Sequence, residues 1–504
     1  MSFRFRPPSG AGDQPAPRPR APRPGSADAE PDDSARDVSG WARGAVTGTA
    51  LTAAAASLSF GLSSVAAAYV ARQVVVPPRY RSEDLAILAY DPDEEPARPG
   101  AGQVRLAATV ETTVDGVYSL RFASGAGHAR IGAVRSWSPS TAEVVREVEE
   151  VYSGDLSTAA RGWWSGTVYP DPGAAGFAYE EVEIPLEMGP APCWVVPADQ
   201  LPAPAPDPSA APERGPGPGD GTGPRHEGTA DVTIAPGAGG DPGAGGGAGG
   251  ARREHPGPWA IMVHGRGAQR MEAIRALRTA HELGMTSLVI SYRNDREAPS
   301  SPDRRYGLGF TEWKDVQLAI SYAKLHGASE IVLFGWSMGG AICLQTADLS
   351  IYRDDIAGLV LTGPVVDWIS LLAHHTTSRR IPPRIARRAT SLISTRRGRW
   401  LTGLAAPVDL GSLDWLTRAD QLRTPTLILH SEDDEFVPDS ASKRLAELND
   451  RVETVSFLRA RHTKEWNVDS RRWESAVLDW ARRCLPEDIG SPRPPATRTR
   501  PARS

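Results

Sequence analysis

One serine stands at the centre of the chemistry that this sequence suggests. Ser337 lies in the run Gly335-Trp336-Ser337-Met338-Gly339, which has the spacing G-x-S-x-G. An apolar, strand-like stretch precedes this run and a helical stretch follows it. A serine held in so tight a strand-to-helix turn exposes its hydroxyl as a nucleophile. The other interpretation is a glycine-rich turn whose serine only caps the helix. Because the context is right on both sides, the pattern predicts Ser337 as an acyl-transfer nucleophile.

A serine nucleophile needs a base, and the base needs a carboxylate that holds its tautomer. Both follow Ser337 in the chain, each directly after a predicted strand. Strand 426–430 leads into the acidic loop 431–438, and strand 452–458 leads into a loop with His462. The order serine, acid, histidine is the one expected for such a turn. We therefore predict His462 as the base, with a surface histidine beside a helix cap as the alternative. The backbone amide of Met338 is the first predicted oxyanion donor.

These motifs resemble the α/β-hydrolase superfamily over roughly residues 179–484. The acid loop of that family often reads H-G-x-x-D-x-x-V-P. The run that starts at His430 follows this pattern and places the acid at Asp434. Glu432 and Asp433 are nearby competitors for this role, and Asp367, after the preceding strand, is a position that some family members use instead. Two positions depart from the family pattern: Ser431 stands for the usual glycine, and Arg461 stands for the glycine that usually precedes the histidine.

The resemblance also implies a second oxyanion donor and a reaction. The family takes this donor from the loop after a strand that ends in His-Gly, here His264-Gly265-Arg266-Gly267, which assigns the amide of Arg266. Its side chain is then expected to face substrate or solvent. The implied function is a serine hydrolase, of the esterase, lipase or peptidase-like branch, that cleaves a carboxylic ester or amide through an acyl-enzyme. No cofactor and no metal are implied. The alternatives are a peptidase, acyltransferase or thioesterase on the same triad, and a non-catalytic membrane-tethered scaffold.

Other residues could shape specificity. Trp336 and Tyr292 lie near the carboxyl ends of predicted strands, where such sheets bind ligands, so both are predicted to contact substrate. Residues 367–414 fall where the family inserts a cap. This segment is rich in arginine, namely Arg379, Arg380, Arg384, Arg387, Arg388, Arg396, Arg397 and Arg399. One interpretation is a lid for anionic substrates or phospholipid head groups, and the other is a solvated basic helix face. The adjacent His374 and His375 are interpreted as part of a solvated loop rather than as metal ligands.

The elements that must position these residues follow from the alternation of strands and helices. Two strands, 179–186 and 191–196, read as a hairpin, and from residue 259 to 484 strands alternate with helices. Such alternation predicts a mostly parallel sheet that is covered on both faces. The expected class is therefore α/β, with the α/β-hydrolase fold, a doubly wound sheet and a cap insertion at 367–414.

A second folded region is expected before this sheet. Residues 80–178 contain short strand-like runs separated by Asp-Gly and Gly-Ala-Gly turn signals. The stretch 141–152 shows helical spacing, with Val144, Val145, Val148 and Val151 on one side. This region is predicted to be a small α+β N-terminal extension.

The remaining segments have the composition of tails and linkers, except one. Residues 1–40 and 485–504 are predicted to be disordered Pro/Arg-rich tails, and 203–257 a disordered Gly/Pro-rich insertion within the hydrolase domain of 179–484. Residues 44–71 instead form an uncharged Ala-rich stretch of transmembrane length. We expect a membrane anchor there, with a signal peptide or a helix packed on the globular domain as alternatives.

Composition limits the partners further. The net charge is −5 and no broad basic surface is evident, so no nucleic acid partner is expected. Three widely spaced cysteines rule out a disulfide framework. The expected partner is a small-molecule ester or amide, and the expected location is membrane-associated through residues 44–71, with a cytoplasmic protein as the alternative. The oligomeric state stays open.

Overall fold

The computed structural model describes residues 63–78, 81–198, 255–486 and Ile489. The predicted tail over 1–40, most of the Gly/Pro insertion and the last residues of the chain lie outside these ranges. The described residues form two sheets, an eight-stranded open sheet and a six-stranded closed barrel. The open sheet carries the residues of the predicted site.

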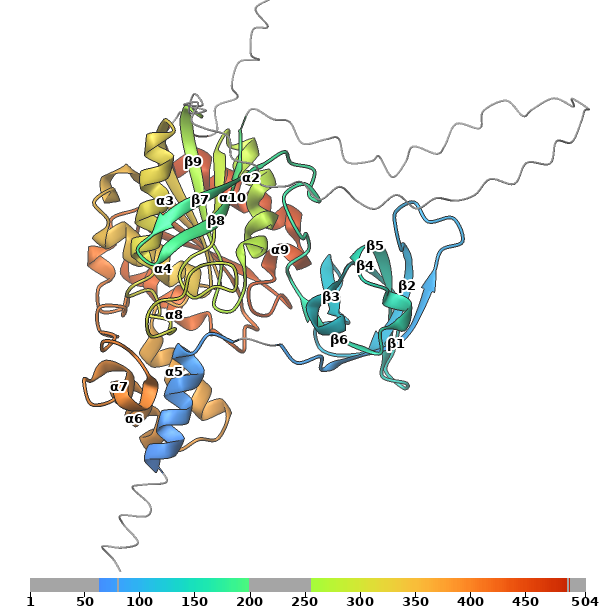
Figure 1. Ribbon diagram of the computed structural model, residues 1–504, viewed down its shortest axis with the longest axis horizontal. Helices are drawn as coiled ribbons and strands as arrows, with labels where there is room; N and C mark the ends of the chain where they lie inside the picture. The colour runs from blue at the N-terminus through green and yellow to red at the C-terminus, as the bar shows by residue number, and fades with distance from the viewer. Residues whose placement is uncertain (1–62, 79–80, 199–254, 487–488, 490–504) are drawn as a thin grey trace, which may run out of the picture. The chain divides into compact units, whose positions relative to one another are not determined.

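The open sheet is mostly parallel and has the order β14-β13-β12-β11-β9-β10-β8-β7 (Figure 1). Strands β7 and β8 form an antiparallel hairpin, and β8 also pairs with β10 in antiparallel orientation. All other pairs are parallel. In chain order its strands are β7 (Glu180–Leu186), β8 (Gly189–Val196), β9 (Gly257–Val263), β10 (Thr286–Ile290), β11 (Ala328–Trp336), β12 (Ile356–Thr362), β13 (Thr426–Ser431) and β14 (Val452–Phe457).

Helices cover both faces of this sheet, because side chains of the central strands alternate between two cores. In β11, Ile331 and Leu333 belong to one hydrophobic cluster, whereas Val332 and Phe334 belong to the other. The first cluster includes residues of α3 (Trp313–Leu325), α4 (Met338–Leu349) and α8 (Ser440–Leu448). The second includes residues of α2 (Leu277–Glu282) and α10 (Ser470–Cys484). The predicted doubly wound α/β class is therefore confirmed.

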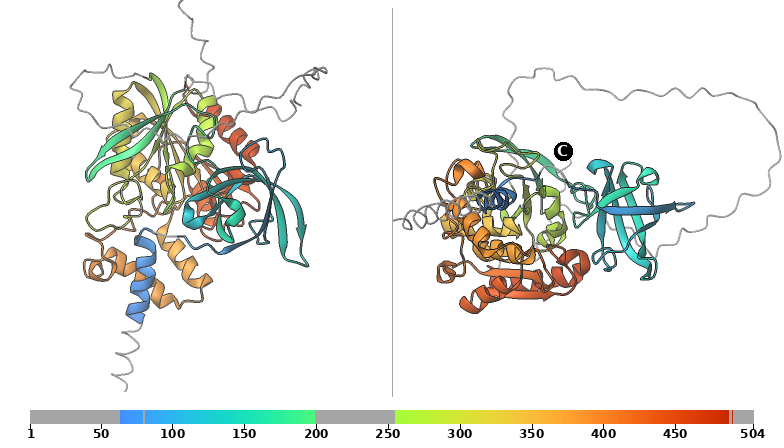
Figure 2. Two further views of the ribbon diagram at one scale, coloured as in Figure 1. Left: turned by 45° about the vertical axis from the view of Figure 1, so that its right-hand side comes forward. Right: turned by 90° about the horizontal axis from the view of Figure 1, so that it is seen from below.

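A cap follows β12, as predicted. It contains α5 (Trp368–Ser378), α6 (Pro383–Ser394) and α7 (Arg399–Thr402). A helix over residues 63–75 lies beside these cap helices in Figure 1 and in the left view of Figure 2. Helix 63–75 packs into the core of the open sheet through Ala67, Ala71 and Val75, which are fully buried.

This packing corrects the expectation of a membrane anchor over 44–71 for the part that is described. Residues 44–62 lie outside the described ranges. From Ser63 on, the stretch lies on the protein, because alanines four residues apart let the helix approach the core closely. That is the packed-helix alternative. In the part of the chain that the structure describes, no helix combines the length and apolar character that crossing a bilayer requires.

The region predicted to be α+β is a barrel of strands in the order β1-β2-β5-β4-β3-β6. These are β1 (Leu85–Pro92), β2 (Gly102–Ala107), β3 (Tyr118–Phe122), β4 (Gly127–Ser138), β5 (Glu143–Ser153) and β6 (Arg161–Ser165). The barrel lies in the chain between helix 63–75 and β7, and both of these belong to the core of the open sheet.

The predicted helix over 141–152 is wrong, because this stretch is strand β5. Val144, Arg146 and Val148 alternate inward, and β5 pairs with β2 on one side and β4 on the other. Arg146 concealed the alternation, since a charged residue is not expected at a core position. Its buried guanidinium donates to the carbonyl oxygens of four loop and strand residues, namely Thr112, Val114, Gly116 and Gly132.

Candidate active site

Ser337 occupies the strained turn between β11 and α4 that its motif predicts. Its backbone has φ 52° and ψ −116°, a conformation that a non-glycine residue adopts only under local constraint. The two flanking glycines allow the turn. A Cβ on Gly339 would lie 2.1 Å from the carbonyl oxygen of Val263, and one on Gly335 would lie 2.8 Å from the backbone of Gly339. Neither position accepts a side chain, so the sequence spacing G-x-S-x-G is required by close backbone approach.

The structure brings the three predicted triad residues together. Nε2 of His462 lies 2.9 Å from Oγ of Ser337, and Nδ1 of His462 lies 2.7 Å from Oδ2 of Asp434. Ser337 follows β11, Asp434 follows β13 and His462 follows β14, so all three stand at the carboxyl edge of the parallel sheet. Their catalytic roles stay predictions, and their geometry is that of a hydrogen-bonded relay.

The competing carboxylates have other partners. Asp433 accepts from the hydroxyl of Ser431 at 2.6 Å and pairs with Arg461. Glu432 pairs with Lys443, and Asp367 caps α5 by accepting from the amides of Ile369 and Ser370. Of the four candidates, Asp434 is the one that contacts His462.

Asp434 is buried and remains ionised. Burial alone would raise the pKa of Asp434, but the charge of His462 and hydrogen bonds from His430, His462 and the Val437 amide lower it strongly. Its Oδ1 accepts from the amides of Phe436 and Val437 at 2.8 and 2.9 Å. Because a carboxylate only accepts hydrogen bonds, Nδ1 of His462 donates to Asp434. Nε2 then has a lone pair for the Ser337 proton.

Both predicted oxyanion donors lie next to Ser337. Met338 is the first residue of α4, so its amide has no partner within the helix. The loop with Gly265 and Arg266 passes so close that a Cβ on Gly265 would lie 3.2 Å from Cβ of Ser337. Among the described residues, neither the Met338 amide nor the Arg266 amide donates to another protein group. The two amides are therefore available to an oxygen bound at this turn.

The side chain of Arg266 does not face substrate or solvent, as was expected. Its guanidinium donates to the carbonyl oxygens of Gln73, Val74 and Val76, at the end of helix 63–75. Tyr306 supports the same junction: its ring faces the guanidinium at 5.8 Å and its amide donates to the carbonyl of Val75. The correction has a physical reason, because the last carbonyls of a helix lack partners and a guanidinium fork can satisfy several of them.

The two predicted substrate contacts, Trp336 and Tyr292, are buried in the core instead. Trp336 packs into the cluster under α2 and α10. Tyr292 stacks on His264 with ring centroids 4.4 Å apart, and its hydroxyl donates to the carbonyl of His264 at 3.1 Å. Both side chains therefore support the loops of the site and do not face substrate.

A second histidine–aspartate pair, which the sequence analysis did not predict, supports the loop that carries Gly265 and Arg266. We name this loop the oxyanion loop. Nε2 of His264 lies 2.6 Å from Oδ2 of Asp295, and both side chains are almost fully buried. Nδ1 of His264 lies 2.8 Å from the carbonyl oxygen of Gly265. Burial alone would lower the pKa of His264, but the charge and hydrogen bond of Asp295 raise it. The only available signal was that His264 and Asp295 both follow strands of one sheet edge.

A third cluster, also missed, lies behind Asp434. His430 places Nε2 2.8 Å from the carbonyl of Val437 and 3.4 Å from Oδ2 of Asp434. Glu465 is fully buried nearby and accepts from the amide of Ser431 at 3.1 Å. Burial raises the pKa of Glu465 to about 7. The site therefore contains a carboxyl group that is partly protonated near neutral pH.

The cap reaches the site through aromatic contacts. The ring of Phe436 lies 4.9 Å from that of His462 and 4.7 Å from that of His375 on α5. His374 lies 3.1 Å from the carbonyl of Glu435 through Nε2. The predicted solvated loop with two histidines is thus part of helix α5, and Phe436 contacts both His375 of the cap and His462.

Comparisons with known proteins agree with this fold. Residues 260–475 match the model of the alpha/beta hydrolase family, and residues 87–165 match a domain of unknown function, DUF8805, which coincides with the barrel. No curated protein matches the chain.

Among solved structures, three proteins are similar at low identity. An esterase of Pyrococcus furiosus is 14% identical (TM-score 0.39), with 63% of this chain and 95% of that chain covered. Est1E of Butyrivibrio proteoclasticus is 15% identical (TM-score 0.37), with 60% and 98% covered. Esterase RhEst1 of a Rhodococcus species is 18% identical (TM-score 0.33), with 45% and 91% covered. Likenesses at this level carry no argument about substrate. The family match, on a sheet of this order, assigns the chain to the α/β-hydrolase superfamily as an enzyme of the hydrolase class.

Proposed function

We propose that the protein is a serine hydrolase that cleaves a carboxylic ester through an acyl-enzyme. The observation that supports this most is the continuous relay from Ser337 Oγ through His462 to Asp434, with contacts of 2.9 and 2.7 Å. A relay of this kind converts a weak hydroxyl nucleophile into an effective one.

In the first half of the proposed reaction, Ser337 attacks the carbonyl carbon of the ester. Nε2 of His462 takes the hydroxyl proton, and Asp434 stabilises the imidazolium that forms. The amides of Met338 and Arg266 bind the oxyanion. Collapse of the tetrahedral intermediate breaks the bond to the leaving alcohol, which takes the proton from His462 and leaves an acyl group on Ser337.

In the second half, water attacks the acyl group. His462 takes a proton from that water, a second tetrahedral intermediate forms at the same two amides, and the carboxylic acid is released as Ser337 regains its proton. Esters are the first substrate class because an alkoxide leaves without prior protonation more readily than an amine. Amides, thioesters and transfer to an acceptor other than water use the same relay.

The first test is labelling of the purified protein with a fluorophosphonate probe, with the modified peptide identified by mass spectrometry. An adduct on Ser337, absent from Ser337→Ala, is the expected result. Hydrolysis of p-nitrophenyl esters by the wild-type protein and not by the variant extends it to turnover. Folded protein with no adduct and equal hydrolysis by both forms would leave the non-catalytic scaffold as the better explanation.

A further inference from the structure

The cap differs sharply in charge from the rest of the chain. Residues 368–408 contain eight arginines and no carboxylate, although the whole chain has a net charge of −5. Seven of these arginines are exposed and form what we call the cap arginine surface, namely Arg379, Arg380, Arg384, Arg387, Arg396, Arg397 and Arg399. So many like charges repel one another, and an external anion would relieve that repulsion.

The cap arginine surface has no internal counterions. Within the described ranges, none of its seven side chains forms an ion pair with a carboxylate. Some exposed arginines elsewhere do pair: Arg444 pairs with Glu447 at 2.7 Å, and Arg483 pairs with Glu453 at 2.9 Å. Exposed arginines without an ion pair also occur elsewhere in the described part of the chain, but the cap gathers seven of them between residues 379 and 399 in a segment that contains no carboxylate, so the cap supplies no counterion for them.

Exposed apolar side chains accompany these charges. On α7, Trp400 is 83% exposed and Leu401 is 45% exposed. Arg72 donates to the carbonyl of Leu401 at 3.3 Å, which places helix 63–75 against α7. On that helix, Val65 and Tyr69 are 71% and 64% exposed, and they lie on the same face as Arg72. Arginine mixed with tryptophan, tyrosine and aliphatic side chains is the composition of surfaces that enter the headgroup region of a bilayer.

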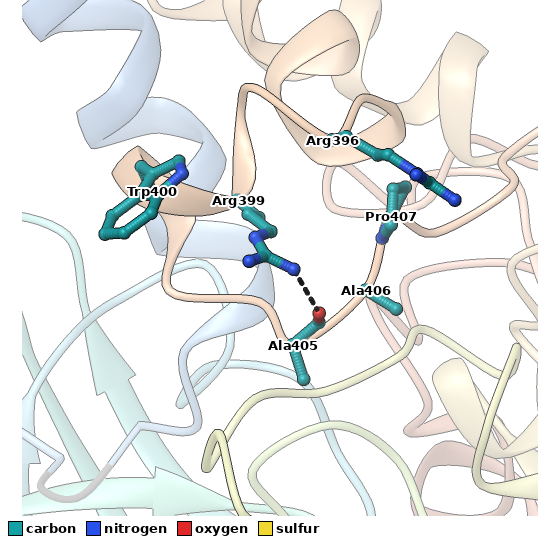
Figure 3. A pocket seen from close by; sticks show the side chains of 6 residues that line it. All are labelled: Arg396, Arg399, Trp400, Ala405, Ala406 and Pro407. Carbon is teal, nitrogen blue, oxygen red and sulfur yellow. Dashed lines mark hydrogen bonds between the residues drawn. The ribbon is translucent and has the colours of Figure 1, made fainter.

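A cavity of about 540 Å³ lies within this surface (Figure 3). It is lined by Arg396, Arg399, Trp400 and residues 405–407. Arg399 donates to the carbonyl of Ala405 at 3.4 Å, and its guanidinium lies 5.9 Å from the Trp400 ring. The guanidinium groups of Arg396 and Arg399 on this lining provide hydrogen-bond donors for a phosphate, and the indole of Trp400 beside Arg399 provides an apolar wall for the glycerol end of a lipid.

We propose that the cap arginine surface docks on an anionic lipid bilayer, with a phosphate headgroup in the cavity at Arg396 and Arg399. A nucleic acid would also attract arginines, but exposed Val65 and Leu401 gain nothing from a solvated phosphodiester backbone. The sequence favours the bilayer as well, because residues 44–62, which lead into helix 63–75, contain no charged side chain. This proposal goes beyond ester hydrolysis, which needs no such surface.

Cosedimentation of the full-length protein with lipid vesicles tests the proposal. We expect binding to phosphatidylcholine vesicles that contain about one third phosphatidylserine, weakened by salt, and much less binding to pure phosphatidylcholine. The variant R396Q/R397Q/R399Q should bind the anionic vesicles roughly 100-fold more weakly, because each arginine charge that is removed should lower the affinity by about tenfold or less. Unchanged melting temperature shows that this variant is folded.

The matched control removes three exposed arginines elsewhere, in R353Q/R444Q/R482Q, with the same change in net charge. These side chains are 56 to 60% exposed and lie outside the cap. The control should retain wild-type affinity. The proposal is overturned by wild-type protein that ignores anionic vesicles at low salt, by equal binding to neutral vesicles, or by equal losses in both triple variants. Displacement from vesicles by duplex DNA at lower concentration than by soluble phospholipid would replace the bilayer with a polynucleotide.

Discussion

His462 and His264 each contact an aspartate at a short distance, 2.7 and 2.6 Å, yet their second nitrogens meet different partners. Nε2 of His462 faces the Ser337 hydroxyl, which can donate a proton to it. Nδ1 of His264 faces the carbonyl oxygen of Gly265, which can only accept. Nδ1 of His264 therefore carries a proton permanently. A second proton lies between Nε2 of His264 and Oδ2 of Asp295, bound either to the nitrogen or to the oxygen.

The difference teaches that pairing with aspartate does not make a histidine a base. Whether a histidine can act as a base depends on the partner of its other nitrogen and on its access to the reacting group. His462 is 22% exposed and opens to the site, whereas His264 is completely buried. The first pair is placed to exchange a proton with Ser337, as proposed, and the second contacts the Gly265 carbonyl of the loop that carries Arg266.

The largest expected effect separates the two pairs by activity. His462→Ala should lower kcat about 10⁴-fold to 10⁶-fold because, among the residues that the structure describes, no other side chain contacts the Ser337 hydroxyl. The melting temperature should change little, since His462 is at the edge of the core. The measurement is ester hydrolysis beside a thermal melt. Retention of more than a hundredth of the activity would show that another base serves Ser337.

The second expected effect distinguishes the two histidine–aspartate pairs by their contribution to the stability of the fold. His264→Gln should lower the free energy of unfolding by about 3 to 5 kcal/mol, because Asp295 is left buried without its partner. Chemical denaturation measures this loss. The double change His264→Gln with Asp295→Asn removes the stranded carboxylate and should recover part of it. Full stability in the single variant would mean that the buried pair does not support the fold.

The third expected effect is a pH dependence of stability that comes from Glu465, in the cluster behind Asp434. Folded Glu465 holds its proton to about pH 7, whereas its ordinary pKa is 4.5. Between these values the folded state binds more protons, so the free energy of unfolding should fall as pH rises. Glu465→Gln keeps an acceptor for the Ser431 amide and should remove this slope, on the order of 3 kcal/mol across the window. Denaturation at several pH values measures it, and identical slopes in both proteins would contradict the assignment.

The smallest effect concerns the oxyanion loop that His264 supports. A lysine in the variant Arg266→Lys cannot bind three helix carbonyls at once, so the loop should be held less firmly in its position. We expect kcat to fall roughly tenfold with KM little changed. Arg72→Lys is the control, because Arg72 is on the same helix and contacts the cap but not the loop. A fall in kcat of the same size in both variants would point to general loosening of the helix.

Much of the fold and the core of the site could be predicted because the signals are local. The G-x-S-x-G turn, the acid loop and the strand-end histidine each lie within a few residues of a predicted strand. A parallel sheet then brings strand ends to one edge, which is how Ser337, Asp434 and His462 meet across 125 residues. The buried state of Trp336 and Tyr292 could not be predicted, since position near a strand end does not say which way a side chain packs.

The features that escaped prediction depend on long-range contacts. Arg266 binds carbonyls about 190 residues earlier in the chain, so no local pattern indicates its partners. His264 and Asp295 acquire their meaning only when two loops pack together. In β5 the valines fit helical and strand spacing alike, and pairing with β2 and β4 decided between them.

The clamp of Arg266 on helix 63–75 makes that helix and the oxyanion loop one thermodynamic unit. Linkage then acts in both directions: whatever orders the loop also protects the helix. A covalent phosphonate on Ser337, which occupies the oxyanion position, should therefore slow amide hydrogen exchange in helix 63–75. Conversely, a change that displaces helix 63–75 should alter the rate at which Ser337 is acylated. Slower exchange there would show that helix 63–75 responds to the state of Ser337.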